Sequence, residues 1–212
     1  IIVRDTTTDA PVQIDIAALR AGSIEGDLSE RDFTVNAMAV NLATLGLLDL
    51  HGGQSDLRHR RLRLVSAGGI QQDPIRALRA VRQAGELGLA LTPETAEVIR
   101  RDGRLLLSVS AERIRDELVR MLLLPDAASA LGRMERLGLL EWTIPELAVL
   151  RGVAQSAPHH LDVWEHTLLT LTRLEALLLW MQTGDQAPAH TPHAEKSRLP
   201  AALVRFHEPL KR

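Results

Sequence analysis

From about residue 70 onwards the chain contains a succession of separate helix starts, and this pattern limits the fold to one with a large helical part. Each start places a capping side chain, with or without proline, ahead of apolar residues at helical spacing. These starts are Asp73-Pro74, Thr92-Pro93-Glu94 and Ser110-Ala111-Glu112. They predict helices at 73–87, at 92–101 and from 110 onwards. Further helices are expected at 126–137, 161–180 and 198–206, and the stretch 182–197 is expected to be a loop or linker.

The first 66 residues have a different pattern, in which short apolar runs alternate with turns. Residues 12–18 (VQIDIAA) predict a short buried strand, and residues 61–65 (RLRLV) alternate as in a half-buried strand. Residues 32–42 predict a helix with Phe33, Ala37 and Val40 on one face. The two parts together predict an α+β fold.

Composition excludes several classes of protein. The chain has no cysteine, so disulfides and thiolate metal sites are excluded. No apolar run is long enough for a membrane span, and we expect no membrane partner and a cytoplasmic location. The net charge of −2 offers no global attraction for nucleic acid, so RNA binding would depend on a local group of basic residues. Because the first residue is Ile1 and not methionine, we expect a fragment of a longer protein.

Four motifs follow one another in a fixed order. They are residues 30–39 (ERDFTVNAMA), 49–53 (DLHGG), 72–82 (QDPIRALRAVR) and 110–118 (SAERIRDEL). Over residues 12–150 this series resembles the class II CCA-adding tRNA nucleotidyltransferases and the related bacterial poly(A) polymerases. The resemblance implies a remnant of a polymerase-β-like nucleotidyltransferase head followed by an all-α neck and body. It also implies transfer of nucleotides from CTP and ATP to the 3′ end of tRNA.

Arg31 and Asp32 form an adjacent cation and anion, which suits a phosphate and a sugar hydroxyl. From the residues alone, a solvated arginine beside a capping aspartate is the favoured interpretation. The resemblance implies instead that the pair handles the triphosphate and ribose of the incoming nucleotide. Glu30 departs from the family pattern, which has a second arginine there, so one phosphate contact is in doubt.

Asp73, Arg76, Arg79 and Arg82 recur every three residues along one predicted helix. An aspartate and an arginine together offer acceptors and a fork of donors that can meet the edges of bases. The alternative is a capping aspartate with a surface ladder of arginines. The resemblance implies that Asp73 and Arg76 select C and A, and that Arg79 and Arg82 support the pair or contact the nucleotide. Here Gln72 replaces the usual glutamate.

Asp15 lies within an apolar run, where a carboxylate is costly unless it is paired or binds a metal. A solvent-facing aspartate at a strand edge is the alternative. The resemblance implies that Asp15 is the third of three carboxylates around two Mg²⁺ ions, a metal and catalytic role. The first two belong to an Asp-x-Asp motif, which this sequence lacks. We therefore expect the chain alone to be inactive.

The segment 159–166 (HHLDVWEH) resembles the start of an HD-type phosphohydrolase domain, whose clustered His and Asp bind metals. The later His-Asp doublet of that domain is missing. We expect residues 158–180 to form a helix that packs through Leu161, Trp164, Leu168 and Leu171 and binds no catalytic metal. The motif at 110–118 is expected to be a capped neck helix, in which Arg113 supports the template helix.

The expected division of the chain is the end of a head domain at 1–66, a helical neck and body that bind RNA and nucleotide at 67–150, and a helical segment at 151–212. The expected function is CCA addition or repair, with the tRNA 3′ end, CTP and ATP as partners and Mg²⁺ as cofactor. A poly(A) polymerase and an enzyme that adds only C or only A remain alternatives. A non-catalytic RNA-binding homologue and an HD-type hydrolase are alternatives from other classes.

Overall fold

The computed structural model describes residues 2–4, 11–13, 16, 18–19, 21–157 and 159–183. Asp15, the predicted helix at 198–206 and most of the predicted linker at 182–197 lie outside the described residues. In chain order the first elements are β1 (Ile2–Arg4), β2 (Pro11–Gln13), α1 (Ile24–Ser29), the 3₁₀ helix η1 (Thr34–Asn36), β3 (Met38–Val40), β4 (Leu47–Asp49), α2 (Gly53–Arg58) and β5 (Arg61–Leu62). The remaining elements are α3 (Gly69–Gln72), α4 (Arg76–Glu86), β6 (Ala90–Leu91), α5 (Pro93–Asp102), η2 (Gly103–Ser108), α6 (Ala111–Leu122), α7 (Ala127–Arg136), α8 (Leu140–Thr143), α9 (Pro145–Ala148) and α10 (Val163–Thr183).

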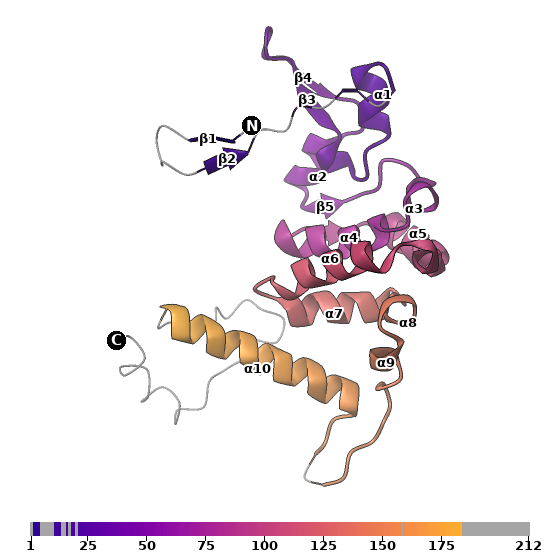
Figure 1. Cartoon of the computed structure of the whole chain (residues 1–212), viewed down its shortest axis with the longest axis vertical. Helices are drawn as coiled ribbons and strands as arrows, with labels where there is room; N and C mark the ends of the chain where they lie inside the picture. Colours follow the sequence, from indigo (N-terminus) through magenta and orange to yellow (C-terminus); the bar gives the residue numbers. More distant parts are fainter. Residues whose placement is uncertain are drawn as a thin grey trace.

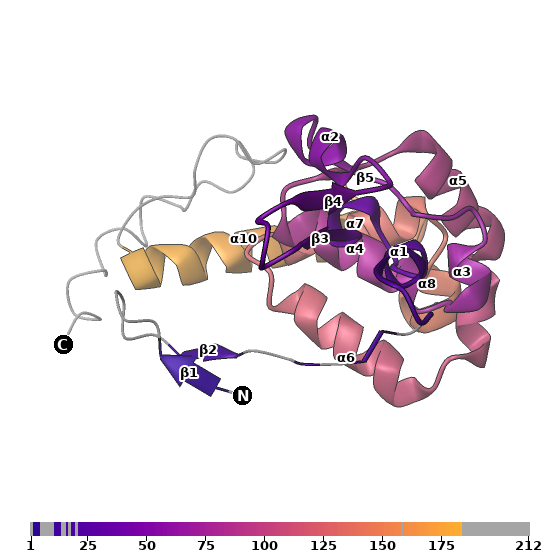
Figure 2. The ribbon, with the colours of Figure 1, turned by 90° about the horizontal axis from the view of Figure 1, so that it is seen from above.

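The elements are stacked along the long axis of the molecule. Figure 1 shows α1, β3 and β4 at one end, α4, α6 and α7 in the middle, and α10 at the other end. Seen from above, α1, β3 and β4 lie over α4 and α7 (Figure 2). The chain thus combines a small mixed region with a stack of helices, which confirms the α+β prediction and its order.

The strands form three two-stranded ladders. β1 pairs with β2 and β3 with β4, both antiparallel, while β5 pairs in parallel with β6. The ladder of β5 and β6 joins Arg61 to Ala90, so it ties the first region to the turn after α4. The predicted strand at 61–65 is confirmed in part, because β5 ends at Leu62 and Leu64 forms an isolated bridge with Phe33.

One expectation in the first region is wrong. Residues 32–42 are not one helix: the short η1 is followed by β3. The reason is backbone pairing with residues 63–65, in which Thr34 N donates to Arg63 O and Val65 N to Asp32 O. Of the strand expected over 12–18, β2 covers Val12 and Gln13, Ile16 is 80% exposed, and residues 14, 15 and 17 lie outside the described residues.

Helix α4 is the centre of the core. It packs against α6 and α7, and its Leu78 and Val81 side chains are fully buried. Gly88 follows it with φ +61°, the left-handed conformation that commonly ends a helix. Other fully buried side chains of the same core come from the first region and from the later helices, namely Phe33, Leu62, Ile99, Leu106, Met134 and Leu139. The burial of α4 fixes the position of the residues at its start.

The later helix predictions agree with the structure, with small differences at the ends. Thr92 caps α5 through a bond from Thr95 N, and Ser110 is the N-cap residue of α6. α10 begins at Val163 rather than at 158 or 161, and packs against α7 with Trp164 buried and Leu168 and Leu171 half-buried. In the described part of the chain, no helix combines the length and the apolar character that a membrane span requires.

Candidate functional site

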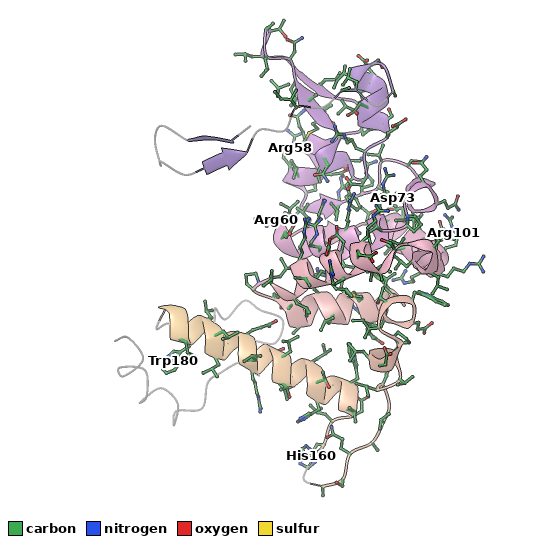
Figure 3. All side chains as sticks on the ribbon, viewed as in Figure 1. Arg58, Arg60, Asp73, Arg101, His160 and Trp180 are labelled. Atoms are coloured by element: carbon green, nitrogen blue, oxygen red, sulfur yellow. The ribbon has the colours of Figure 1, made fainter. Side chains whose placement is uncertain are left out.

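A pocket of about 570 Å³ opens where the segment after α1 meets the starts of α4 and α6. Its lining residues are Arg31, Asp32, Asn36, Asp73, Arg76, Arg79 and Arg113. Figure 3 shows Asp73 at the level where the first region meets the helix stack, whereas Arg58 and Arg60 lie on the other side of that view. Five of the residues singled out from the sequence are thus brought together, although the chain between them spans nearly fifty residues.

Asp32 is held in a fixed orientation by its neighbours. Its Oδ1 accepts hydrogen bonds from the backbone N of Phe33 at 2.8 Å and from Nδ2 of Asn36 at 2.9 Å. Asn36 Nδ2 also donates to Oε1 of Gln83 on α4, at 2.9 Å. The Oδ2 atom of Asp32 lies 3.9 Å from an Nη atom of Arg79. One carboxylate oxygen is therefore used for anchoring, and the other faces a cation.

Arg76 is buried and connects the first region to α4. Its Nη2 donates to the backbone oxygen of Glu30 at 2.6 Å, and its Nη1 donates to that of Gly69 at 3.2 Å. Its Nε is buried without a hydrogen-bond partner. Glu30, which departs from the family pattern, therefore contributes its backbone oxygen here. A buried donor without an acceptor is costly. Arg76 also lines the pocket.

Asp73 does not cap α4 with its side chain, which corrects the expectation from the sequence. The structure shows no side-chain cap on α4. Both carboxylate oxygens of Asp73 instead contact Nη2 of Arg113, at 2.9 and 3.0 Å. The reason lies in the packing of α6 against α4, which brings Arg113 to the carboxylate.

Arg79 and Arg82 share one acceptor on α6. Glu117 is buried and accepts from Nε of Arg79 at 3.2 Å and from Nε of Arg82 at 2.6 Å. Arg82 also donates to Glu86 at 2.6 Å. Burial lowers the pKa of Arg82, but its bonds to Glu117 and Glu86 raise it further, so that the net pKa is raised. Arg79 lines the pocket, and Arg82 fastens α4 to α6 behind it.

The charge of the pocket suits an anionic ligand that also carries hydrogen-bonding groups. Four arginines and two aspartates line it, which leaves an excess of two positive charges in the lining. Arg31 uses Nε and Nη2 on Asp27, and Arg113 uses one Nη on Asp73. A guanidinium has five N–H donors, so both arginines retain donors for phosphate or base oxygens.

The motif at 49–53 supports the segment that carries Asp32 and Asn36. Asp49 accepts from the backbone N of Gly53 at 2.7 Å and of Gln54 at 3.0 Å. Burial opposes these bonds, yet together they lower the pKa of Asp49. A Cβ at Gly53 would collide with the backbone oxygen of Thr34. This close approach of α2 to η1 places the segment that carries Asp32 and Asn36.

The sequence predicts a metal-binding role for Asp15 and no catalytic metal at the segment 159–166. Asp15 lies outside the described residues, and no group of three or more His, Asp or Glu side chains that suits a metal ion occurs among those described. In the 159–166 segment, Asp162 accepts from Gly152 N and Glu165 N and so caps α10. The ring of His166 packs edge-on against that of His159, with 5.1 Å between centroids.

The sequence singled out neither Asn36 nor Glu117, and Arg113 only as a support for the helix. Asn36 and Glu117 lie inside the motifs at 30–39 and 110–118, so the sequence shows that both are polar residues within these motifs. Their partners were not, because Asn36 bonds Gln83 across 47 residues and Glu117 bonds Arg82 across 35.

Comparisons with known proteins agree with the motifs. A model of the poly(A) polymerase head domain matches residues 3–63, and a model described as the probable RNA- and SrmB-binding site of polymerase A matches residues 88–150. The A-adding tRNA nucleotidyltransferase of Deinococcus radiodurans is 43% identical over 173 residues, which are 79% of this chain and 39% of that protein. The CC-adding tRNA nucleotidyltransferase of Thermus thermophilus is 42% identical over 171 residues, 78% of this chain and 38% of that protein.

The fold also matches a solved structure. The CCA-adding enzyme of Bacillus stearothermophilus, in complex with CTP, superposes with a TM-score of 0.57 at 30% identity, over 88% of this chain and 46% of that chain. The chain spans about two fifths of the length of the curated relatives that it matches. The model of the head domain and the model of the RNA-binding site match this chain in the same order as the motifs. The chain therefore belongs to the family of poly(A) polymerases and CCA-adding tRNA nucleotidyltransferases.

Proposed function

We propose that this chain selects the nucleotide in a template-independent RNA nucleotidyltransferase. That enzyme adds C and A nucleotides to the 3′ end of tRNA from CTP and ATP and releases pyrophosphate. One observation carries the proposal: acidic acceptors and arginine donors from three separate motifs line a single pocket. The expected compartment is the cytoplasm.

Base selection follows from the chemistry of Asp73 and Arg76. A carboxylate accepts hydrogen bonds only, and the exocyclic amino group of C or A donates them. Arg76 lines the pocket, and its guanidinium carries only donors, which suit an acceptor atom of the same base. U and G present a carbonyl oxygen where C and A present the amino group. A site built on fixed donors and acceptors penalises a base that leaves them unpaired.

The other lining residues suit the rest of the nucleotide. Arg31 retains donors for the triphosphate, and Oδ2 of Asp32 can accept from a ribose hydroxyl, with Arg79 beside it. Arg82 has an indirect role, because it does not line the pocket but holds α4 against α6 through Glu117.

We also propose Mg²⁺ as the cofactor, with Asp15 as its ligand in this chain. Bound metal would activate the attacking hydroxyl and stabilise the leaving pyrophosphate. The described residues contain no cluster of three suitable metal ligands. The proposed role of these residues is therefore nucleotide binding and does not involve the metal. Nucleotide binding, rather than turnover, is therefore the property to test in this chain.

The alternative within the family is an enzyme that adds only C or only A. One observation favours it: the relatives at 43% and 42% identity are an A-adding and a CC-adding enzyme. Because the two sequence identities are nearly equal, they do not indicate whether such an enzyme would add C or A.

Titration calorimetry on the purified chain tests the proposal. We expect CTP and ATP to bind more tightly than UTP and GTP, and Asp73→Ala to remove the difference. Arg115→Ala is the matched control, since Arg115 is exposed on α6 and pairs with the adjacent Asp116. Preference for one of CTP and ATP alone supports the single-nucleotide alternative. Equal binding of all four nucleotides contradicts both, and tRNA binding without nucleotide binding supports an RNA-binding homologue.

A further inference from the structure

The backbone of Asp73 is placed for helix capping. Asp73 is extended, with φ −147° and ψ 95°, and its carbonyl oxygen accepts the first bond of the turn from Arg76 N at 3.0 Å. From such a position an aspartate side chain ordinarily accepts from the backbone N–H two or three residues further on. Here those N–H groups belong to Ile75 and Arg76, yet α4 has no side-chain cap.

The carboxylate of Asp73 is instead turned towards α6. Both its oxygens lie within 3.0 Å of Nη2 of Arg113, forty residues along the chain. Arg113 stands one turn before Glu117, whose ion pair with Arg82 is buried between α4 and α6. The packing of the two helices therefore determines where the guanidinium of Arg113 stands, and both Arg113 and Asp73 line the pocket.

Neither arrangement of Asp73 has a large energetic advantage. The ion pair is exposed, with 28% of the Asp73 side chain and 48% of the Arg113 side chain accessible. Exposed ion pairs and helix N-caps contribute free energies of similar size. The side chain of Asp73 thus has two competing partners, and the presence of Arg113 decides between them.

We infer that Arg113 is the positioning residue that draws the Asp73 carboxylate away from the start of α4 and presents it to the pocket as the acceptor for a base. This inference rests on the proposed function for its consequence. With Arg113 in place, the acceptor stands ready for the amino group of C or A. Without it, the carboxylate turns to the N–H groups of Ile75 and Arg76, and the pocket loses the group that distinguishes CTP from UTP.

The test compares Arg113→Ala, Arg113→Lys and the control Arg115→Ala by two measurements on the whole chain. The first is the ratio of the dissociation constants for UTP and CTP. We expect Arg113→Ala to reduce this ratio about tenfold or more, Arg113→Lys to restore part of it, and Arg115→Ala to leave it unchanged. In the Asp73→Ala background, Arg113→Ala should have no further effect on the ratio, because it acts through Asp73.

The second measurement is amide hydrogen exchange at Ile75 and Arg76 without nucleotide. Capping by Asp73 in Arg113→Ala should slow exchange at these amides, and thermal stability should be nearly unchanged because one contact replaces another. An unchanged nucleotide ratio together with unchanged exchange overturns the inference. If the unmodified chain shows no preference for CTP, the proposed function fails, and the exchange measurement alone decides whether Arg113 turns Asp73.

Discussion

The Nε atom of Arg82 lies 2.6 Å from Oε2 of Glu117, and both side chains are at most 10% exposed. The same carboxylate accepts from Arg79 at 3.2 Å, so one acidic side chain of α6 connects two successive turns of α4. Because Arg79 lines the pocket and Arg82 does not, Glu117 joins the pocket to the core between the helices.

Glu117→Ala should lower the free energy of unfolding by about 3 kcal/mol, because it leaves buried Arg82 without its main partner. Urea unfolding followed by circular dichroism measures the change. Glu86→Ala is the control: Glu86 is 36% exposed and contacts the same arginine, so its loss should cost less than about 1 kcal/mol. Equal costs for the two variants would show that the buried pair is not what fastens α4 to α6.

Thr95→Val should destabilise the protein by about 1–3 kcal/mol, because it leaves a buried N–H without an acceptor. Oγ1 of Thr95 accepts from the backbone N of Leu64 at 3.0 Å and so links the first region to α5. As a control, Thr170→Val removes an exposed hydroxyl that bonds within its own helix, and it should change stability by less than about 0.5 kcal/mol. A neutral effect of Thr95→Val would mean that this link does not support the fold.

Glu175→Gln should make the protein more stable at pH 7 but not at low pH. Burial raises the pKa of Glu175, against the lowering effect of its bond from the backbone N of Ala128. A carboxyl whose pKa is higher in the folded state binds its proton more tightly there. The stability that protonated Glu175 gives the folded state is therefore complete below the pKa of the unfolded chain, about 4.3. It is lost as the pH rises through the raised pKa of the folded state.

Glutamine keeps an oxygen acceptor for Ala128 N and removes the charge. Unfolding experiments at pH 7 and below about pH 4 check this prediction, since the advantage of the variant should disappear at the lower pH. Lower stability of the variant at pH 7 would contradict it.

Arg76→Ala should lower both stability and nucleotide preference. Arg76 donates to two backbone oxygens that belong to different segments, so its loss should cost about 2 kcal/mol or more. In a longer enzyme that contains this chain, we expect reduced use of CTP and ATP and weaker discrimination against UTP and GTP. Incorporation of labelled nucleotides measures this, and an unchanged preference would remove Arg76 from base selection.

Local patterns in the sequence determined the helices and the identity of most pocket residues. The cap at Thr92, the start of α6 after Ser110, the apolar period of α4 and the left-handed Gly88 depend on contacts within about four residues, and so they can be inferred from spacing alone. The side chain of Ser110 forms no cap bond. The motif at 72–82 likewise placed Arg76 and Arg79 on successive turns of one helix, with Asp73 at its start; in the structure Asp73 lies just before α4.

Contacts between distant segments decided the rest. Backbone bonds from Thr34 and Val65 make residues 32–40 an extended segment with a short 3₁₀ turn, although their apolar spacing predicts a helix. The side chain of Asp73 likewise leaves the helix start that local rules assign to it, because the packing of α6 against α4 brings Arg113 within 3.0 Å. Spacing within one helix carries no information about a partner forty residues away, and only the packed core fixes that partner's position.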